Sequence, residues 1–534
     1  MPSRVGRRAP LAPAPRAEAS RPPRAPTATP RPGASASTSS FAPTTRAARH
    51  TADRRASASS THLTPHPHAP LSAPPPSASR SRRRTHRGRP RGPVLRIASA
   101  TFRRQYATRS AEAAAPAVAR AARSATNPEA LHREGGRAPQ VPTETATSAG
   151  LSFELSEEAL QVREMVRDFA ESEIRPIAAR IDETHEFPTE NVRKLAELGL
   201  LGMFVPEEYG GAGMTYQAYV VAIEELSRVC ASHGVIASVN NSLVCYPLMT
   251  YASHEQKKRW LEPLAKGELL GAYCLTEPNA GSNAANQQTT AVLDGDEWVL
   301  NGSKIFITNA GPADVLITYA ATDRAAGPKG ISAFIVDAKV PGVRKGKKEH
   351  KLGIHASDTR EIYYENARIP KDCLFGELNK GYSVALATLG GGRIGIAAQA
   401  LGIAQACVEA AVAYANTREQ FDRKIGEFDA IRQMLADSAV ELETARLLVY
   451  QSAWLRDQGR PHVKEASLAK WHASEAASRC ANLAVQVHGG YGYMTEYHVE
   501  RYLRDAKICE IYEGTTEVQK MVVAGQVLKE HALS

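Results

Sequence analysis

Residues 271–377 differ in character from the chain on either side of them. Short runs of β-branched and aromatic residues occur here, for example 315–319 and 331–336, and the dipeptides Asp294-Gly295 and Asn301-Gly302 are hairpin signals. On both flanks, apolar residues recur at helical spacing instead. The pattern therefore predicts a middle antiparallel β domain between two helical parts.

We expect an α+β multidomain protein, because its length allows more than one domain. Helical order is expected to begin with Ser156 as an N-cap. A buried helical stripe should follow at Tyr219, Ala222, Ile223, Leu226 and Cys230. The predicted segments are a leader (1–150), an N-terminal α-helical domain (151–270), the β domain (271–377) and a C-terminal α-helical domain like a four-helix bundle (378–534).

The leader carries the positive charge. Residues 1–111 contain 22 arginines, no lysine and two acids, so the formal net charge of +10 belongs to this part and the remainder is acidic. The low content of large apolar residues in the leader predicts disorder.

The Arg-rich, Ser-rich, acid-poor composition of the leader is typical of a transit peptide, and a possible basic amphipathic helix at 94–107 favours the mitochondrial matrix. An RNA-binding tail is the alternative, but it would usually interleave aromatic residues. No nucleic-acid partner is expected.

The sequence gives no signal for a metal site, a disulfide framework or a membrane span. His488 has no second metal ligand at usable spacing. The longest apolar run, 394–415, contains Gln399, Gln405 and Glu409, which predicts a buried helix and no transmembrane segment. Seven scattered cysteines are expected to be reduced and mostly packed: Cys230, Cys245, Cys274, Cys373, Cys407, Cys480 and Cys509.

Several short motifs could contact a polar, planar ligand. Phe306 and Thr308 would project from one side of a strand. Arg393, after a flexible turn of three glycines, and Arg418 could each contact a phosphate. The string Q-V-H-G-G-Y-G-Y at 486–493 is a helix ended by glycines, where backbone can approach a ligand. Taken singly, each motif also fits an ordinary turn, core residue, ion pair or helix cap. No dinucleotide fingerprint or phosphate loop occurs.

Taken in order, these motifs resemble the acyl-CoA dehydrogenase family, and most closely its short-chain (butyryl-CoA) branch. The matching strings between residues 155 and 530 are Y-C-L-T-E-P-x-A-G-S, K-I-F-I-T-N, G-G-R-I-G-I-A-A-Q-A-L-G, R-x-Q-F, Q-V-H-G-G-Y-G-Y and R-D-A-K-I-x-E-I-Y-E-G-T. The resemblance implies an FAD-dependent enzyme of fatty-acid oxidation. Such an enzyme converts an acyl-CoA to trans-2-enoyl-CoA and passes electrons to electron-transfer flavoprotein.

The resemblance also implies roles for individual residues, and a shared flavin site that requires at least a homodimer, with a homotetramer expected. Contacts to FAD would come from Tyr273, Leu275, Thr276, Ser282, Phe306, Ile307, Thr308, Thr515 and Glu517. The adenosine-pyrophosphate half of a flavin held mainly by a neighbouring subunit would meet Arg418, Gln420, Phe421, Gln486, Gly489 and Gly490. The substrate would be contacted by Ser282, Arg393, Tyr512 and Gly514.

Glu513 would be the catalytic base that removes the α-proton while the β-carbon gives a hydride to the flavin. A backbone N–H at the glutamate and a flavin hydroxyl would polarise the thioester carbonyl. Desolvation should raise the pKa of the carboxyl group toward the working pH. Some branches, such as isovaleryl-CoA dehydrogenase, carry the base just before the Arg of G-G-R. That position is Gly392 here, so the pattern leaves Glu513 as the candidate.

The chain departs from the usual family residues at five positions, two of which place acids near the expected FAD phosphates or adenine. Two alternatives therefore stay open: a short branched-chain acyl-CoA dehydrogenase, and a catalytically weakened scaffold or assembly protein on the same fold. The departures are Asn283 for Asp, His355 for Arg, Gly390 for an acid, Asp422 for Gly and Asp429 for Gln.

Overall fold

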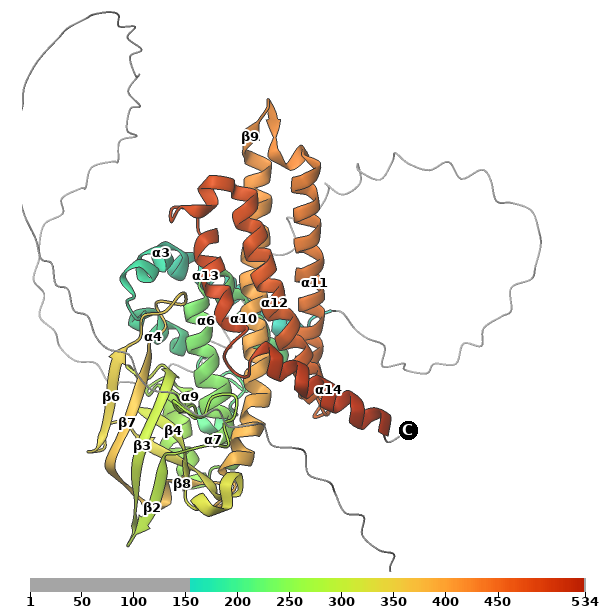
Figure 1. Ribbon diagram of the computed structural model, residues 1–534. Helices are drawn as coiled ribbons and strands as arrows, with labels where there is room; N and C mark the ends of the chain where they lie inside the picture. Colours follow the sequence, from blue (N-terminus) through green and yellow to red (C-terminus); the bar gives the residue numbers. More distant parts are fainter. Residues whose placement is uncertain (1–153, 533–534) are drawn as a thin grey trace, which may run out of the picture. The chain divides into compact units, whose positions relative to one another are not determined.

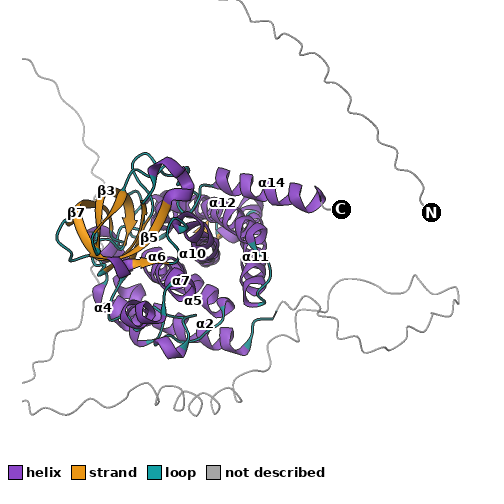
Figure 2. Ribbon diagram, turned by 90° about the horizontal axis from the view of Figure 1, so that it is seen from below, coloured by secondary structure: helices purple, strands orange, loops and turns teal. Residues whose placement is uncertain are grey.

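The computed structural model of the protein describes residues 154–532, and the predicted leader lies outside the described residues. Helices come first, then a sheet, then helices again (Figure 1). Figure 2 shows the strands gathered at one side of the helical body. The order of helices and sheet agrees with the order predicted from the sequence.

The first helix, α2 (Glu157–Phe169), begins where the sequence predicts. The Ser156 hydroxyl accepts a hydrogen bond from the Ala159 N–H at 3.2 Å and caps the helix. The predicted stripe lies on α5 (Tyr216–Val229) and its C-cap Cys230, and it is buried because α2, α6, α10 and α11 pack against α5. The remaining helices of this part are α3 (Arg175–Thr184), α4 (Thr189–Glu197), α6 (Ala231–Ser238), α7 (Tyr246–Tyr251), α8 (His254–Gln256) and α9 (Glu262–Ala265), with π-helical segments at Ala170–Ile174, Val239–Cys245 and Lys257–Leu261.

The sheet contains the strands β1 (Gly271–Cys274), β2 (Thr290–Asp294), β3 (Glu297–Thr308), β4 (Val315–Ala321), β5 (Ile331–Asp337), β6 (Val343–Lys348), β7 (Thr359–Pro370) and β8 (Leu374–Phe375). Their order is β6-β7-β3-β2-β4-β5-β8, with β1 beside β4. Most pairs are antiparallel, while β1 runs parallel to β4. The sheet has an apolar core of its own around Trp298, Phe334 and Tyr364.

One of the two predicted hairpins is wrong. The turn between β2 and β3 is Gly295-Asp296, so the Asp294-Gly295 signal marks a hairpin as expected. Asn301-Gly302, however, lies inside β3, which continues unbroken to Thr308. The pairing of β3 with β7 shifts register between Leu300 and Gly302, and Gly302 has φ 143°. The glycine thus allows a β-bulge that bends a long strand, which a dipeptide rule does not distinguish from a turn.

The C-terminal helices are α10 (Gly381–Thr417), α11 (Asp429–Asp457), α12 (Val463–His488), α13 (Val499–Cys509) and α14 (Thr516–Ala532), with a small hairpin of β9 (Glu419–Gln420) and β10 (Arg423–Lys424). Helix α10 is long and apolar enough to cross a membrane, but 67% of its most apolar window is buried in the protein. It packs against α12, α11 and α5. We therefore describe α10 as the core helix of the C-terminal part.

The three glycines before Arg393 lie inside α10, so the expected flexible turn ahead of that helix is wrong. A Cβ at Gly391 would contact the Arg456 guanidinium, and a Cβ at Gly392 would collide with the Glu513 carboxylate. These two glycines let neighbouring side chains approach the helix closely, and tertiary packing outweighs their low helix propensity.

Candidate active site

Glu513 lies in the loop that joins α13 to α14, in a left-handed backbone conformation with φ 51°. This conformation is uncommon for a residue other than glycine, and local contacts must hold it. The Gln519 side-chain amide donates to the carbonyls of Glu513 (3.2 Å) and Gly514 (3.0 Å). The Lys470 ammonium donates to the Gly514 carbonyl at 2.7 Å. The loop is therefore fixed from two neighbouring helices.

The Glu513 carboxylate has one oxygen sealed from solvent. Oε2 is buried and has no hydrogen-bond partner. It faces Gly392 so closely that a Cβ there would stand less than 3.0 Å away. Burial raises the pKa of Glu513 to about 8, against the opposing charges of Lys470 and Arg393. A carboxylate in such an environment is poised to accept a proton near neutral pH.

Arg393 and Tyr512 lie beside this carboxylate. Arg393 on α10 is buried, and one of its guanidinium nitrogens donates weakly to the Ser467 hydroxyl at 3.4 Å. Its Nε has no partner. The Tyr512 hydroxyl donates to the Gln399 side-chain carbonyl on α10. The structure thus brings Arg393, Tyr512, Glu513 and Gly514 together.

A second group of predicted residues lies where β1 and β3 end. The Ile305 N–H donates to the Thr276 carbonyl at 2.9 Å and joins the segment after β1 to the end of β3. Phe306 is 65% exposed with φ 60°, while Ile307 is buried. Phe306 and Thr308 therefore lie on the accessible side of the strand. The predicted residues of this group are Tyr273, Leu275, Thr276, Ser282, Phe306, Ile307 and Thr308.

A buried ion pair supports these two segments from behind. The Lys304 ammonium, which is fully buried, donates to the Glu277 carboxylate (2.7 Å), the Gln287 amide oxygen (2.7 Å) and the Leu275 carbonyl (3.3 Å). The other carboxylate contacts of Glu277 come from backbone N–H groups of Gln288 and Thr289. All members of this network are satisfied, so it rigidifies the surface that Phe306 and Thr276 present.

Replacement of Lys304 by methionine should lower the free energy of unfolding by about 3–5 kcal/mol, because it leaves the Glu277 carboxylate buried and unpaired. Urea unfolding of the purified protein measures the effect. Lys347 is exposed on β6 of the same sheet, and Lys347→Met is the matched control, expected to change the free energy by less than about 0.5 kcal/mol. Equal effects of both changes would contradict the structural role of the pair.

A third group of predicted residues lies at the other end of α10. Arg418 follows the helix, and Phe421, between β9 and β10, is 88% exposed. Figure 1 shows this hairpin beyond the end of α10. Gln486, Gly489 and Gly490 at the end of α12 are also exposed. Gly392 lies 25 residues before Thr417 on the same helix, which corresponds to about 37 Å. Within one chain, this group does not meet Glu513.

Thr515 and Glu517, the remaining predicted flavin contacts, lie at the start of α14. The Thr515 hydroxyl accepts a hydrogen bond from the Val518 N–H at 3.4 Å. Glu517 is exposed in the first turn. Both are close in sequence to Glu513 and lie next to the group formed by Arg393, Tyr512, Glu513 and Gly514.

Three departures from the family pattern have local structural consequences. His355 lies within hydrogen-bond distance of the carbonyls of Asp182 (3.1 Å) and Lys351 (2.8 Å). Asp422 has φ 60°, the conformation that a glycine adopts freely. Asp429 opens α11, where a negative charge favours the helix dipole. Asn283 is exposed, and a Cβ at Gly390 would meet nothing within 4 Å.

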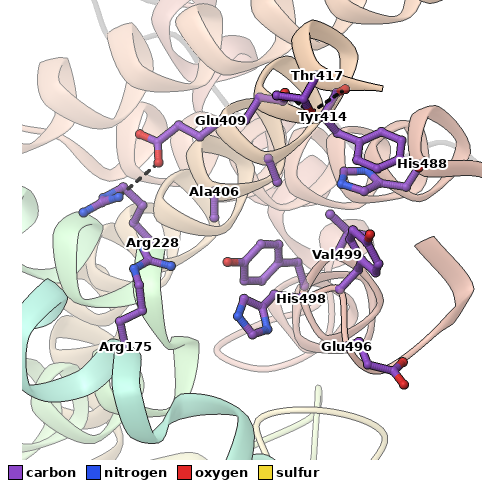
Figure 3. A pocket seen from close by; sticks show the side chains of 14 residues that line it. Arg175, Arg228, Ala406, Glu409, Tyr414, Thr417, His488, Glu496, His498 and Val499 are labelled. Carbon is purple, nitrogen blue, oxygen red and sulfur yellow. Dashed lines mark hydrogen bonds and ion pairs between the residues drawn. The ribbon is translucent and has the colours of Figure 1, made fainter. Parts of the chain in front are cut away.

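A pocket of about 480 Å³ lies between α10, the start of α13 and the N-terminal helices, next to the third group and away from Glu513 (Figure 3). Its wall includes Tyr414 and His488, whose rings stack, and Arg228, which pairs with Glu409 at 3.0 Å. None of its lining residues is a predicted site residue. The residues with candidate catalytic roles lie around Glu513 instead.

Sequence reasoning missed the residues that support the site from behind. Lys470, Gln519, Lys304 and Gln399 are all buried and contact site residues through side-chain hydrogen bonds. For Lys470 a signal existed, because a lysine at a core-facing position of an Ala-rich helix is rare unless it has a partner. The partners of these four residues are set by tertiary packing.

Comparison with known proteins decides the family. Residues 156–268, 272–367 and 379–528 match the N-terminal, middle and C-terminal domains of acyl-CoA dehydrogenase. The chain belongs to the acyl-CoA dehydrogenase family. It is 51% identical to a short-chain specific acyl-CoA dehydrogenase of Clostridium acetobutylicum, over 71% of this chain and all of the relative. It is 50% identical to the human mitochondrial short-chain enzyme, over 71% of this chain and 92% of the relative.

Solved structures agree with this assignment. Butyryl-CoA dehydrogenase from Megasphaera elsdenii has a TM-score of 0.70 and 43% identity, and the match covers 71% of this acyl-CoA dehydrogenase and all of that chain. A glutaryl-CoA dehydrogenase from Mycobacterium smegmatis in complex with FADH2 has a TM-score of 0.67 and 32% identity, over 70% of this chain and 95% of that one. The protein is thus a flavin-dependent oxidoreductase with FAD as its cofactor.

The residues present fit a bound flavin. Phe306 exposes an aromatic face next to Thr308. Glu513 Oε2 and Arg393 Nε are buried polar atoms without hydrogen-bond partners. Gly489 and Gly490 have open space where a side chain would stand. An aromatic cover, hydroxyl donors and accessible backbone are the groups that a planar, polar cofactor with phosphates requires.

Proposed function

We propose that this chain is a short-chain acyl-CoA dehydrogenase of fatty-acid oxidation in which Glu513 removes the α-proton of the acyl-CoA. The observation that carries the proposal is the Glu513 carboxylate: Oε2 is buried, unpartnered and held against Gly392. A weakly acidic C–H needs a base of raised pKa, and burial supplies that base here.

The chain's own residues would bind and orient the reactants. Phe306, Ile307 and Thr308, with the segment after β1, would hold the flavin ring, and bound FAD supplies a hydride acceptor. Arg393 would lie by the CoA arm and Tyr512 by the acyl group. Gly514 has φ 89° and carries no side chain, so backbone can approach the thioester. The backbone N–H of Glu513 would polarise the carbonyl oxygen as the α-proton moves to the Glu513 carboxylate.

Side chains beside Glu513 support the proposed short-chain preference. Gly395 lies nearly one turn beyond Gly392 on α10, and a Cβ there would collide with the hydroxyls of Tyr219 and Ser238. These two hydroxyls hydrogen-bond each other at 2.9 Å. We propose that they close the acyl pocket about one helical turn, or roughly 5 Å, beyond the base, which leaves room for a short chain only.

Anaerobic bleaching of the flavin tests the proposed function. Purified protein should be yellow and should bleach faster with butyryl-CoA than with octanoyl-CoA, 2-methylbutyryl-CoA or isobutyryl-CoA. Faster bleaching with either branched substrate would favour the branched-chain alternative. A colourless protein that FAD cannot reconstitute would favour the scaffold alternative, which rests only on the five departures from the family pattern.

The pH dependence of kcat/KM should follow the Glu513 carboxyl group. Its pKa in the folded protein is raised to about 8, so the base is ionised above this pH and protonated below it. We expect kcat/KM for butyryl-CoA to fall about tenfold per pH unit below about 8 and to reach a plateau above it, because kcat/KM reports ionisation of the free enzyme. A profile that is flat between pH 6 and 9 would contradict the assignment.

We propose that the active protein is a homo-oligomer, at least a dimer and by family resemblance a tetramer. The roughly 37 Å along α10 between Gly392 and Thr417 exceeds the reach of one flavin, so the third group, with half-buried Arg418 and exposed Phe421 and Gly489, would serve a neighbouring subunit. Exposed apolar residues on α11 and α14 recur at seven-residue intervals and suit a helical interface: Val440, Leu447 and Trp454, and Met521 and Leu528. Sedimentation equilibrium of the purified protein would measure the number of subunits in the oligomer.

The cellular context follows from the same resemblance. Mammalian relatives are mitochondrial, while the Clostridium relative is equally similar. The Arg-rich leader supports the mitochondrial matrix with a transit peptide, and electron-transfer flavoprotein is the proposed electron acceptor. Import of the full chain, but not of a chain that starts at residue 151, into isolated mitochondria tests the location.

A further inference from the structure

Lys470 on α12 is a fully buried cation next to the base. Its Nζ donates to the Gly514 carbonyl at 2.7 Å, one residue after Glu513. In the described part of the chain no carboxylate lies within ion-pair distance of it. Buried ammonium groups are costly without a charged partner. A neutral side chain would satisfy one carbonyl at lower cost, so the charge itself calls for an explanation.

The charged and titratable groups around Lys470 come from three elements. Glu513, Glu510 and the Cys509 thiol face it from the end of α13 and the following loop, and Arg393 faces it from α10. Glu510 is already engaged by Lys507 at 2.6 Å and by the Ser478 hydroxyl. Glu513 has an unpartnered oxygen. Glu513 is therefore the carboxylate left to balance the charge of Lys470.

We infer that Lys470 is a positioning residue for the base: its ammonium fixes the left-handed loop through the Gly514 carbonyl and places positive charge behind the Glu513 carboxylate. The inference rests on the proposed role of Glu513. Burial raises the pKa of Glu513 and lowers the pKa of Lys470, each to about 8. The opposite charge of the other residue acts against each shift, so the two charges stabilise each other. Tyr219 faces Glu513 from α5, and its hydroxyl stays neutral in this range because burial raises its pKa to about 12.

Gln519 provides a matched control for this inference. Its amide donates to the same Gly514 carbonyl at 3.0 Å and to the Glu513 carbonyl, but it carries no charge. Lys470→Met removes a loop contact and a charge, whereas Gln519→Leu removes loop contacts alone. Comparison of the two variants therefore separates the structural contribution from the electrostatic one.

The experiment measures the ionisation of Glu513 in two ways: by the pH midpoint of kcat/KM for butyryl-CoA, and by the infrared carboxyl band that is lost in Glu513→Gln. In Lys470→Met both midpoints should move up by one unit or more, with a roughly tenfold lower kcat/KM at pH 7. In Gln519→Leu the rate should fall with the midpoint unchanged. An unchanged midpoint in Lys470→Met would show a merely structural lysine and overturn the inference.

Two further measurements keep the inference testable. Lys470→Gln retains a donor and removes the charge, and it should show the same upward midpoint if Lys470→Met does not fold. The reciprocal test leaves Lys470 unchanged. The labelled ε-carbon of Lys470 should show a lower titration midpoint of the ammonium in Glu513→Gln than in the wild type. The same Lys470 midpoint in the two proteins overturns the inference. If Glu513→Gln still bleaches with butyryl-CoA, the proposed base is wrong, while the infrared titration still decides about Lys470.

Discussion

Replacement of Glu513 by glutamine is expected to lower kcat/KM for butyryl-CoA by roughly 10²–10⁴-fold, the usual contribution of a general base. Glutamine keeps the size of the side chain and the left-handed loop contacts through Gln519 and Lys470, which bind backbone carbonyls. The variant should therefore remain folded and yellow. The assay is anaerobic reduction of the flavin at saturating and limiting substrate.

Glu510→Gln is the matched control for this prediction. Glu510 lies three residues away and its carboxylate is engaged by Lys507 and Ser478, so its loss should change kcat/KM less than about threefold. A Glu513→Gln protein that bleaches as fast as the Glu510→Gln protein would show that the base had been assigned to the wrong residue.

The second large effect is expected from a single methyl group at Gly392. A Cβ there collides with the Glu513 carboxylate and also with a methyl group of Leu243. The carboxylate must move, and a displacement of about 1 Å from the reacting C–H can cost on the order of 10² in rate. Gly392→Ala should therefore retain FAD and lower kcat about 10²-fold, as single-turnover kinetics would measure.

Gly390→Ala provides the control on the same helix. A Cβ at Gly390 meets nothing within 4 Å, so this change should keep near-normal kcat and stabilise α10 by up to about 1 kcal/mol through helix propensity. Similar kinetics for the two alanine variants would contradict the contact between Gly392 and the base.

Local signals predicted much of the fold. The Ser156 cap, the buried stripe of α5 and the change from helices to strands all follow from residue spacing and side-chain chemistry. The errors occurred where tertiary contacts decide the local structure. Gly302 permits a bulge because β7 pairs along the whole of β3, and Gly391 and Gly392 stay helical because side chains distant in sequence pack onto them.

The candidate site was predictable in part. The motif order indicated Glu513, Arg393 and the Phe306 segment, and the structure places Arg393 beside Glu513. The supporting residues were not predictable, because Lys470 and Glu513 are 43 residues apart and meet only when α12 packs against the loop after α13. Spacing rules describe neighbours on one helix or strand, and contacts between elements depend on how those elements pack.

The most direct test of the account is exchange of the α-hydrogens of acetyl-CoA in D2O by the oxidised holoenzyme. Acetyl-CoA has α-hydrogens but no β-carbon, so the base can act while no hydride can leave. We predict that the wild-type protein incorporates deuterium at the α-carbon, read by mass spectrometry, and that Glu513→Gln does not. Equal incorporation by the two proteins would contradict the claim that Glu513 removes the α-proton.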